Sequence, residues 1–295
     1  MSDNTNKPLY GALEAGGTKM ICAVGTADGK ILDRVSFPTE TPAETVPKMT
    51  AYFSDKGISA IGIGCFGPID LIPGSETYGY ITTTPKTAWK NYNIVKAFKD
   101  ALGVPVGFDT DVNAAILGEA GFGAAKGLKN AVYATIGTGV GIGVLSEGRL
   151  LHGVLHPEGG HILIARREGD TAKSACPFHE NCLEGLAAGP SIEKRWGKKG
   201  FEIADRPEVW DLEAYYIAQA LVNYTLLLAP ERIVLGGGVM AQEQLFPLIR
   251  EKYKELLNGY LSVKEIEDLD SYIVPSSLGG SQAVLGCFLL AKDAL

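Results

Sequence analysis

The chain has 295 residues, 46% of them hydrophobic and 37 of them glycine, which is enough to bury a large core and to form two lobes. Its formal net charge of −7 argues against a nucleic acid or an anionic membrane as a partner. No apolar run approaches the roughly 18–20 residues of a membrane span, and residues 1–7 are too polar for a signal peptide, so we expect a cytoplasmic protein.

The first predicted element is a β-hairpin. Residues 9–24 alternate small and apolar side chains around the turn Gly16-Gly17-Thr18. A second turn, of the acidic-glycine kind that hairpins favour, follows at residues 28–30. The chain therefore begins with strands joined by tight glycine turns.

Helices and strands then alternate. Residues 44–56 and 94–102 are predicted helices, and residues 60–66 and 104–108 are predicted buried strands. Residues 70–93 are rich in turn formers, which predicts an ordered surface loop, and loops of that length usually have a function. An alanine-rich helix over residues 114–124 would begin the bridge to a second lobe.

The plan of the first hairpin recurs in the middle of the chain. Residues 132–145 again read as strand, glycine turn and strand, around Gly137-Thr138-Gly139, and residues 147–151 repeat the second acidic-glycine turn with its basic and apolar followers. This internal repeat predicts two lobes of one ancestral design, with both glycine turns facing a shared cleft.

Residues 153–184 collect the residue types that bind zinc. Cys176, His179 and Cys182 are separated by two-residue gaps, so one tight turn can aim all three side chains at one point. The fourth ligand would be His161 or His156, and His161 is favoured because two glycines before it let the backbone fold back. The remaining cysteines, at positions 22, 65 and 287, are expected to be buried free thiols.

Two catalytic zinc patterns do not fit this loop. A deaminase-type site needs a shorter cysteine spacing than that of Cys176 and Cys182, and a helical zinc-protease site cannot form across Pro157 and its neighbouring glycines. Four protein ligands leave no open coordination position, so the predicted zinc is structural. A strand over residues 162–165 is expected inside the loop.

The last third is predicted to contain helices over residues 212–228 and 280–295, the latter packing back on the first lobe. Between them, residues 231–239 read as a strand that opens onto the turn Gly236-Gly237-Gly238. This is the third glycine turn after a strand. Glycines let backbone N–H groups approach phosphate oxygens, and three such turns favour a nucleotide held from both lobes.

Asp111 is the candidate catalytic residue. It follows a predicted strand at the start of a predicted helix, where a carboxylate can also serve as an N-cap. Asp109 offers an alternative cap, which would leave Asp111 free to accept the proton of a sugar hydroxyl that attacks the γ-phosphate. Glu158, His161 and Glu184 would then bind the other hydroxyls.

These motifs together resemble the ROK family of sugar kinases, and within it the bacterial fructokinases. The matching segments span nearly the whole chain in order: residues 13–19, 111–115, 137–141, 158–161, 182–184 and 236–238. The resemblance implies an α/β fold of the ribonuclease H-like, hexokinase and actin-like ATPase class. Its first lobe would cover residues 1–115 and 280–295, and its second lobe, with the zinc loop at 156–184, residues 116–279. A homodimer and magnesium carried by ATP are also implied.

The resemblance also implies roles for individual residues. Asp111 would be the general base, and the zinc ligands would be His161, Cys176, His179 and Cys182. The implied sugar-binding residues are Gly67, Pro68, Thr110, Glu158, His161 and Glu184. The implied ATP-binding residues are Gly16, Gly17, Thr18, Lys19, Thr138, Gly139, Pro190, Gly237 and Gly238.

Two positions depart from the family pattern. Glu14 stands where the first glycine motif usually has Asp, and Thr110 stands where the residue before the base is commonly Asn, a sugar ligand. D-fructose is the expected substrate, with glucose, mannose or N-acetylmannosamine as alternatives. A sugar sensor without turnover, related to the repressors of the same family, and a zinc-dependent hydrolase that needs no ATP are the rival classes.

Overall fold

The computed structural model describes residues 7–295 and divides them into two compact units. Unit 1 holds the chain up to Lys126 together with His152–His156 and Leu278–Leu295, and unit 2 holds Gly127–Leu151 and Pro157–Ser277. The first boundary differs from the expected one after residue 115, because helix α3 (Asp111–Phe122) packs along its length on unit 1. Residues 1–6, most of the polar start considered above, lie outside the described residues.

Unit 1 is built on a five-stranded mixed sheet with the order β3-β2-β1-β4-β7. β2 runs antiparallel to β1 and β3, whereas β4 runs parallel to β1 and β7. The strands are β1 (Leu9–Ala15), β2 (Lys19–Gly25), β3 (Ile31–Pro38), β4 (Ile58–Cys65) and β7 (Val106–Thr110). β1, β2 and β4 are buried almost throughout because helices cover both faces of the sheet.

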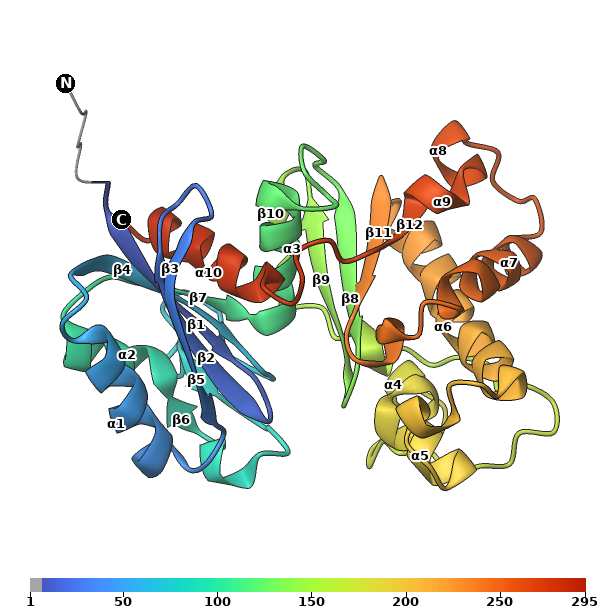
Figure 1. The fold of residues 1–295 in the computed structure, drawn as a ribbon, viewed down its shortest axis with the longest axis horizontal. Coiled ribbons are helices and arrows are strands. Elements are labelled where there is room, and N and C mark those ends of the chain that lie inside the picture. The colour runs from blue at the N-terminus through green and yellow to red at the C-terminus, as the bar shows by residue number, and fades with distance from the viewer. Residues whose placement is uncertain (1–6) are drawn as a thin grey trace. The chain divides into compact units, whose positions relative to one another are not determined.

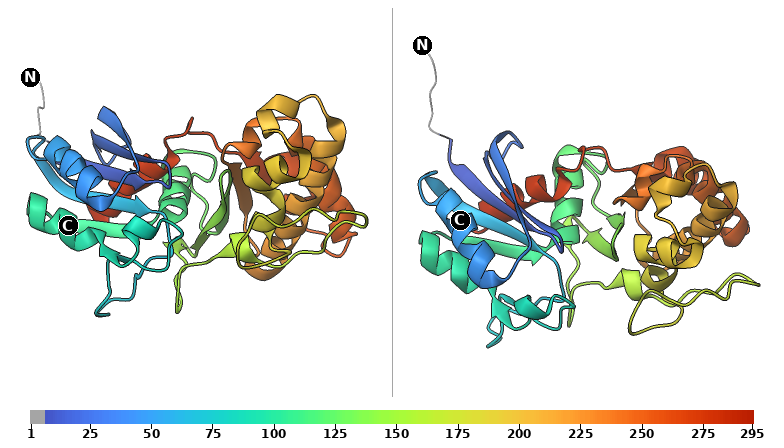
Figure 2. Two further views of the ribbon diagram at one scale, coloured as in Figure 1. Left: turned by 90° about the horizontal axis from the view of Figure 1, so that it is seen from below. Right: turned by 60° about the horizontal axis from the view of Figure 1, so that its bottom comes forward.

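The C-terminal helix of unit 1 lies close against the sheet and against α3. A Cβ atom at Gly62 would come within 1.8 Å of the Cys287 carbonyl oxygen, and one at Gly286 within 1.7 Å of the Ala114 carbonyl oxygen. Only glycine allows these backbones to approach so closely. Both views of Figure 2 show this red helix beside the blue strands. The helices of unit 1 are α1 (Pro42–Phe53), α2 (Ile94–Leu102), α3 and α10 (Gln282–Asp293).

The turn-rich stretch at residues 70–93 is ordered, but the prediction that it is only a surface loop was wrong. It contains a small antiparallel pair, β5 (Tyr80–Ile81) with β6 (Tyr92–Asn93), and the side chains of Ile81 and Trp89 are buried in the core. The Trp89 indole N–H donates to the Glu40 carbonyl at 2.7 Å, which satisfies its polar atom. Alternating buried residues are too sparse here for the sequence to reveal this.

Unit 2 repeats the sheet of unit 1 with the order β10-β9-β8-β11-β12 (Figure 1). β8 and β9 form an antiparallel hairpin, and β11 runs parallel to β8 and to β12. The strands are β8 (Ala131–Ile136), β9 (Val140–Ser146), β10 (Arg149–Leu150), β11 (Arg232–Gly236) and β12 (Ile273–Pro275). The repeat seen in the sequence is therefore a repeat of strand order and direction, and the expected pair of mixed sheets flanked by helices is confirmed.

Helix α6 (Pro207–Leu228) packs against α7 (Leu245–Leu257) in unit 2 and is longer than predicted. It starts five residues before the predicted start because Pro207 is tolerated in the first turn of a helix. The other helices are α4 (Leu183–Ala187), α5 (Gly189–Trp196), α8 (Lys264–Glu267) and α9 (Leu269–Tyr272).

The strand expected at residues 162–165 does not form. Leu163 makes a single bridge to Cys182 and is 61% exposed. The Ala165 backbone is satisfied by the Gln219 side chain, which accepts from its N–H and donates to its carbonyl, both at 3.0 Å. A side-chain amide thus takes the place of a neighbouring strand.

The structure also tests the expectations for membrane-spanning helices and for the cysteines. Within residues 7–295, no helix combines the length and the hydropathy that a membrane span requires. All five cysteines are buried and free, as expected for positions 22, 65 and 287.

Candidate functional site

Asp111 opens helix α3 directly after strand β7. Its N-cap is Thr110, whose hydroxyl accepts from the Asn113 N–H at 3.0 Å. The expectation that Asp109 is the cap is corrected, because its Oδ1 accepts instead from the Thr110 N–H and from the Asn113 amide, both at 2.7 Å. Asp111 Oδ1 accepts from the neighbouring Val112 N–H at 2.9 Å, and burial raises the pKa of Asp111 to about 6.

A second carboxyl group, Glu14, faces the same region of unit 1. In the sheet, Glu14 pairs laterally with Gly64, and Gly64 with Asp109, so Glu14 and Asp109 point to the face that carries α3. A Cβ atom at Gly64 would lie 3.3 Å from the Asp111 Cα. The glycine therefore makes room for Asp111 between two acidic side chains.

Glu14 is held in an unusual state. Its Oε2 is buried and has no hydrogen-bond partner among the described residues. Burial, and then the negative charge of Asp111, raise the pKa of Glu14 to about 7. Burial thus raises the pKa of both carboxyl groups, and the negative charge of Asp111 adds to the rise at Glu14. The sequence showed that Glu14 stands where the family usually has Asp, but it could not show that this side chain is buried.

The Gly67-Pro68 turn, predicted to line the sugar pocket, lies at the end of β4 in unit 1. Its Pro68 carbonyl accepts from both the N–H and the hydroxyl of Thr82, at 2.8 and 3.0 Å. The His156 ring packs against Gly67, and its Nε2 accepts from the Ile69 N–H at 3.3 Å. His156 therefore belongs to this turn of unit 1 and not to the cysteine-histidine loop of unit 2.

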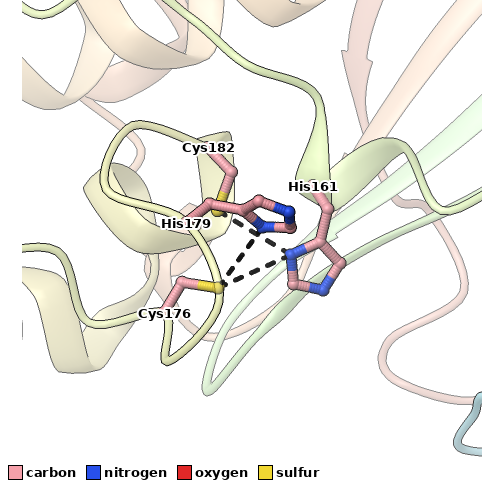
Figure 3. Close-up of side chains that lie close together, drawn as sticks. All are labelled: His161, Cys176, His179 and Cys182. Carbon is pink, nitrogen blue, oxygen red and sulfur yellow. Dashed lines mark hydrogen bonds between the residues drawn. The ribbon is translucent and has the colours of Figure 1, made fainter.

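The four predicted zinc ligands converge in unit 2. His161, Cys176, His179 and Cys182 each offer one ligand atom, and these atoms all lie within 4.8 Å of one another. The Cys176 sulfur lies 3.8 Å from His161 Nδ1 and 3.7 Å from His179 Nδ1, and the Cys182 sulfur lies 3.7 Å from His161 Nδ1. Figure 3 shows the sulfurs and ring nitrogens facing one another. Ligands of a tetrahedral zinc ion are about 3.3–3.8 Å apart, so the donor set fits the metal.

His161 has its two ring nitrogens in different surroundings. Nδ1 faces the cysteine sulfurs, and Nε2 lies 3.9 Å from Glu184 Oε1. The other oxygen of Glu184 accepts from the Val140 N–H at 3.0 Å. The two roles predicted for His161, metal ligand and sugar ligand, would therefore use different atoms of one ring.

Glu158, the third predicted sugar ligand of unit 2, precedes the 3₁₀ turn Gly159–His161, and its carbonyl accepts from the His161 N–H at 3.0 Å. The Tyr224 hydroxyl of α6 donates to the Gly159 carbonyl at 2.8 Å. This turn is therefore fixed against the core of unit 2. A Cβ at Gly160 would come within 1.8 Å of the Val140 carbonyl oxygen, so only glycine fits there.

Three predicted ATP-binding segments meet in unit 2. The Gly189 N–H, just before Pro190, donates to the Gly137 carbonyl at 2.7 Å, and a Cβ at Gly137 would lie 3.5 Å from the Gly238 nitrogen. Gly237 has a φ of +91°, a conformation open to glycine. The turns after β8 and β11 and the start of α5 thus form one glycine-lined surface, on which Thr138 and Gly139 also lie.

The other predicted ATP-binding segment is the β1–β2 turn of unit 1. The Gly16 N–H donates to the Lys19 carbonyl at 3.0 Å, which closes the turn. Thr18 and Lys19 are exposed, and Gly17 is partly exposed. The turn therefore presents a hydroxyl and an ammonium group to solvent, both of which can bind phosphate.

The sequence reasoning missed one ionisable group of unit 1. His152 Nε2 lies 2.9 Å from Asp109 Oδ2, and the Asp109 side chain is 4% exposed. The hydrogen bond to Asp109 raises the pKa of His152. The sequence signal for His152 is its position directly after the second repeat. That position does not predict a contact with Asp109.

Comparison with known proteins decides the family. A family model described as "ROK family" matches residues 10–294. The chain belongs to the ROK family. It is 50% identical over 287 residues to a fructokinase of Pediococcus pentosaceus, covering 97% of this chain and 99% of the relative. It is 47% identical over 290 residues to a fructokinase of Streptococcus mutans, covering 96% and 97% of the two chains.

A solved structure agrees with this family assignment. The ROK hexokinase from Thermus thermophilus superposes with a TM-score of 0.78 at 27% sequence identity, covering 97% of this ROK protein and 98% of that chain. The expected hexokinase and actin-like fold is thereby confirmed for the ROK chain.

Proposed function

We propose that this ROK protein is an ATP-dependent hexose kinase that converts D-fructose to D-fructose 6-phosphate. Relatives named fructokinase that share about half of its residues over nearly the whole chain support this choice of sugar. The structural observation that carries the proposal is the Asp111 carboxyl group at the start of α3, with a pKa of about 6. Such a group is ionised at neutral pH, yet basic enough to accept a proton.

In the proposed reaction Asp111 accepts the proton of the 6-hydroxyl group while the hydroxyl oxygen attacks the γ-phosphorus of ATP. The bond between the γ-phosphorus and the bridging oxygen breaks, and ADP leaves with the electron pair of that bond. Asp111 later releases the proton to solvent. Glu158, His161 and Glu184, with Gly67, Pro68 and Thr110, are the proposed sugar-binding residues.

The nucleotide would be held by backbone N–H groups of the glycine turns. In unit 2 these are the turns that contain Thr138, Gly139, Gly237 and Gly238, beside Pro190; in unit 1 it is the turn Gly16–Lys19. Magnesium would reach the site with ATP and would neutralise charge on its phosphates. Glu14, whose Oε2 is without a partner among the described residues, offers the kind of hard oxygen atom that magnesium prefers.

Structural zinc is proposed at His161, Cys176, His179 and Cys182, since their donor atoms fit a tetrahedral ion. Zinc supplies folding free energy to the loop when bound. The chain's own contribution is orientation: with Nδ1 committed to the metal, His161 keeps Nε2 toward Glu184. The homodimer and the cytoplasmic location expected from the sequence remain predictions.

A panel of hexoses tests the proposal. Purified protein is incubated with ATP, magnesium and either fructose, glucose, mannose or N-acetylmannosamine, and ADP release is followed by a coupled assay. We expect fructose to give a kcat/KM at least about tenfold above the others. A higher value for another hexose would reassign the substrate, and sugar binding without ADP release would support the sensor alternative instead.

A further inference from the structure

His152 is fixed by a buried carboxylate. Its Nε2 lies 2.9 Å from Asp109 Oδ2. The other Asp109 oxygen already accepts from the Thr110 N–H and the Asn113 amide, each at 2.7 Å. A carboxylate can only accept, so Nε2 of His152 carries a proton. The hydrogen bond to Asp109 therefore keeps a proton on Nε2 and fixes the orientation of the ring.

The opposite edge of the same ring is available. The His152 side chain is 40% exposed, and its Nδ1 forms no hydrogen bond with the described residues. His156, four residues later on the same segment, differs in this respect. It is 5% exposed, and its Nε2 accepts from the Ile69 N–H. A histidine that served only to anchor the segment would not need to leave so much of its side chain exposed.

His152 also lies between the two parts of unit 1 that the proposed function assigns to the sugar. Its partner Asp109, and Asn113, whose amide nitrogen lies 3.4 Å from Nε2, flank Asp111 in the chain at the junction of β7 and α3. On its other side, His152 lines a cavity of about 490 Å³ together with Ile69 and Thr82. Both of these residues adjoin the Gly67-Pro68 turn, since Thr82 donates twice to the Pro68 carbonyl.

The neighbouring polar side chain is already engaged. Thr110 is 3% exposed, and its hydroxyl caps α3 by accepting from the Asn113 N–H. Any contact of Thr110 with the sugar is therefore confined to a small exposed surface, whereas the His152 side chain is 40% exposed. Of the side chains around this junction, the exposed edge of His152 is better placed to contact a hydroxyl group of a ligand.

We propose that His152 is a sugar-binding residue, with Nε2 fixed by Asp109 and Nδ1 hydrogen-bonded to a hydroxyl group of the hexose. This inference rests on the proposed function, because it assumes that a hexose binds beside Asp111. A sugar hydroxyl can both donate and accept, so it suits either protonation state of the ring. The raised pKa of His152 favours the charged ring, whose hydrogen bonds are the stronger ones.

Two amide substitutions separate sugar binding from anchoring. The side-chain nitrogen of Gln can replace Nε2, and that of Asn can replace Nδ1. H152Q therefore keeps a donor for Asp109 and loses the group that faces the sugar. We expect H152Q to keep the wild-type Tm and the KM for ATP, while its KM for fructose rises about 10–100-fold. H152N should lower Tm but raise the KM for fructose less than H152Q does.

L32T is the control, because Leu32 lies on β3 of unit 1, is 50% exposed and does not line this cavity. It should leave Tm and both KM values unchanged. An H152Q protein with the wild-type KM for fructose would overturn the proposal, and so would a rise in the KM for ATP that matches the rise for fructose. Calorimetric titration with fructose in the absence of nucleotide compares the affinities of the wild type, H152Q and H152N for the sugar alone. It keeps this test separate from the proposed function, which fails if wild-type protein phosphorylates no hexose.

Discussion

The two sheets share their strand order but place different chemistry at the same position. In unit 1, Glu14 of β1 lies beside Gly64 of β4, and in unit 2, Thr135 of β8 lies beside Gly236 of β11. Both Glu14 and Thr135 are the last residue but one of their strands. The unit 1 position is ionisable and the unit 2 position is not.

The elements that cover these glycines explain the difference. In unit 1 the space over Gly64 is bounded by Ala114 and Asp111 of α3, which follows β7 directly. In unit 2 the space over Gly236 is filled by the Tyr133 ring. After β12 the chain passes into Leu278–Leu295, which belongs to unit 1, so no helix of unit 2 follows β12. On the proposed function, the repeated scaffold would thus carry the proton acceptor in unit 1 and backbone N–H donors for phosphate in unit 2.

The largest expected effect breaks the unit 1 side of this comparison. D111N removes the proposed base while keeping nearly the same shape, so kcat should fall by roughly 10²–10⁴-fold or more. Fructose should still bind, which calorimetry can measure. D100N, at an exposed aspartate of α2 paired with Lys96, is the control and should keep wild-type turnover. Unchanged turnover in D111N would remove Asp111 from the mechanism.

The next effect concerns the loop of unit 2, which has no counterpart in unit 1. C176S should lower zinc content and reduce Tm by roughly 5–10 °C, because structural zinc contributes folding free energy. C22S changes another buried cysteine, one outside the loop, and should leave the zinc content unchanged. Elemental analysis of wild-type protein that finds no zinc would end the zinc proposal.

A smaller effect tests the buried carboxyl group of unit 1. The pKa of Glu14 is raised from 4.5 to about 7, so the folded state holds the proton more tightly than the unfolded state. Below about pH 4.5 both states are protonated and this costs nothing. The cost grows between pH 4.5 and 7 and is then constant, at up to about 3 kcal/mol.

E14Q removes that cost without changing the shape of the side chain. Its free energy of unfolding should exceed that of the wild type at pH 8, and the gain should vanish at pH 4.5. Denaturant unfolding at the two pH values, without ligands, measures both quantities. An equal change at the two pH values would show that Glu14 does not titrate as described.

The smallest expected effects come from substitutions in the glycine turn after β11 of unit 2. Gly237 has a φ of +91°, and a Cβ there would lie 2.4 Å from the Ile136 carbonyl oxygen, whereas a Cβ at Gly238 meets no atom within 4 Å. G237A should therefore destabilise the protein by about 1–3 kcal/mol. G238A should keep the wild-type Tm and raise the KM for ATP, because its methyl group would stand where the proposed function places the phosphates. An unchanged KM for ATP in G238A would argue against phosphate binding at this turn.

The sequence predicted the repeated hairpins because glycine turns between apolar strands are local signals. It also predicted which cysteines and histidines come together, since Cys176, His179 and Cys182 are close in the chain. The fourth member of the cluster was to be either His156 or His161. The two glycines before His161 favoured His161, which is the histidine that lies beside the cysteines. Local spacing and backbone freedom were sufficient for these features.

Long-range contacts limited the remaining predictions. Thr110 and Asp109 are adjacent, and only the contacts of Asp109 with Asn113 and His152 decide which of them caps α3. The strand expected at residues 162–165 fails because Gln219, far away in the chain, satisfies the Ala165 backbone. The burial of Glu14 likewise depends on α3 and α10, which pack over its strand only in the folded chain.

The pH dependence of fructose phosphorylation tests the central claim most directly. With magnesium, ATP and limiting fructose, kcat/KM should fall about tenfold per pH unit below an apparent pKa near 6 and level off above it, because Asp111 must be ionised to accept the proton. A kcat/KM that stays constant from pH 7 to pH 5, in protein that remains folded, would contradict the account.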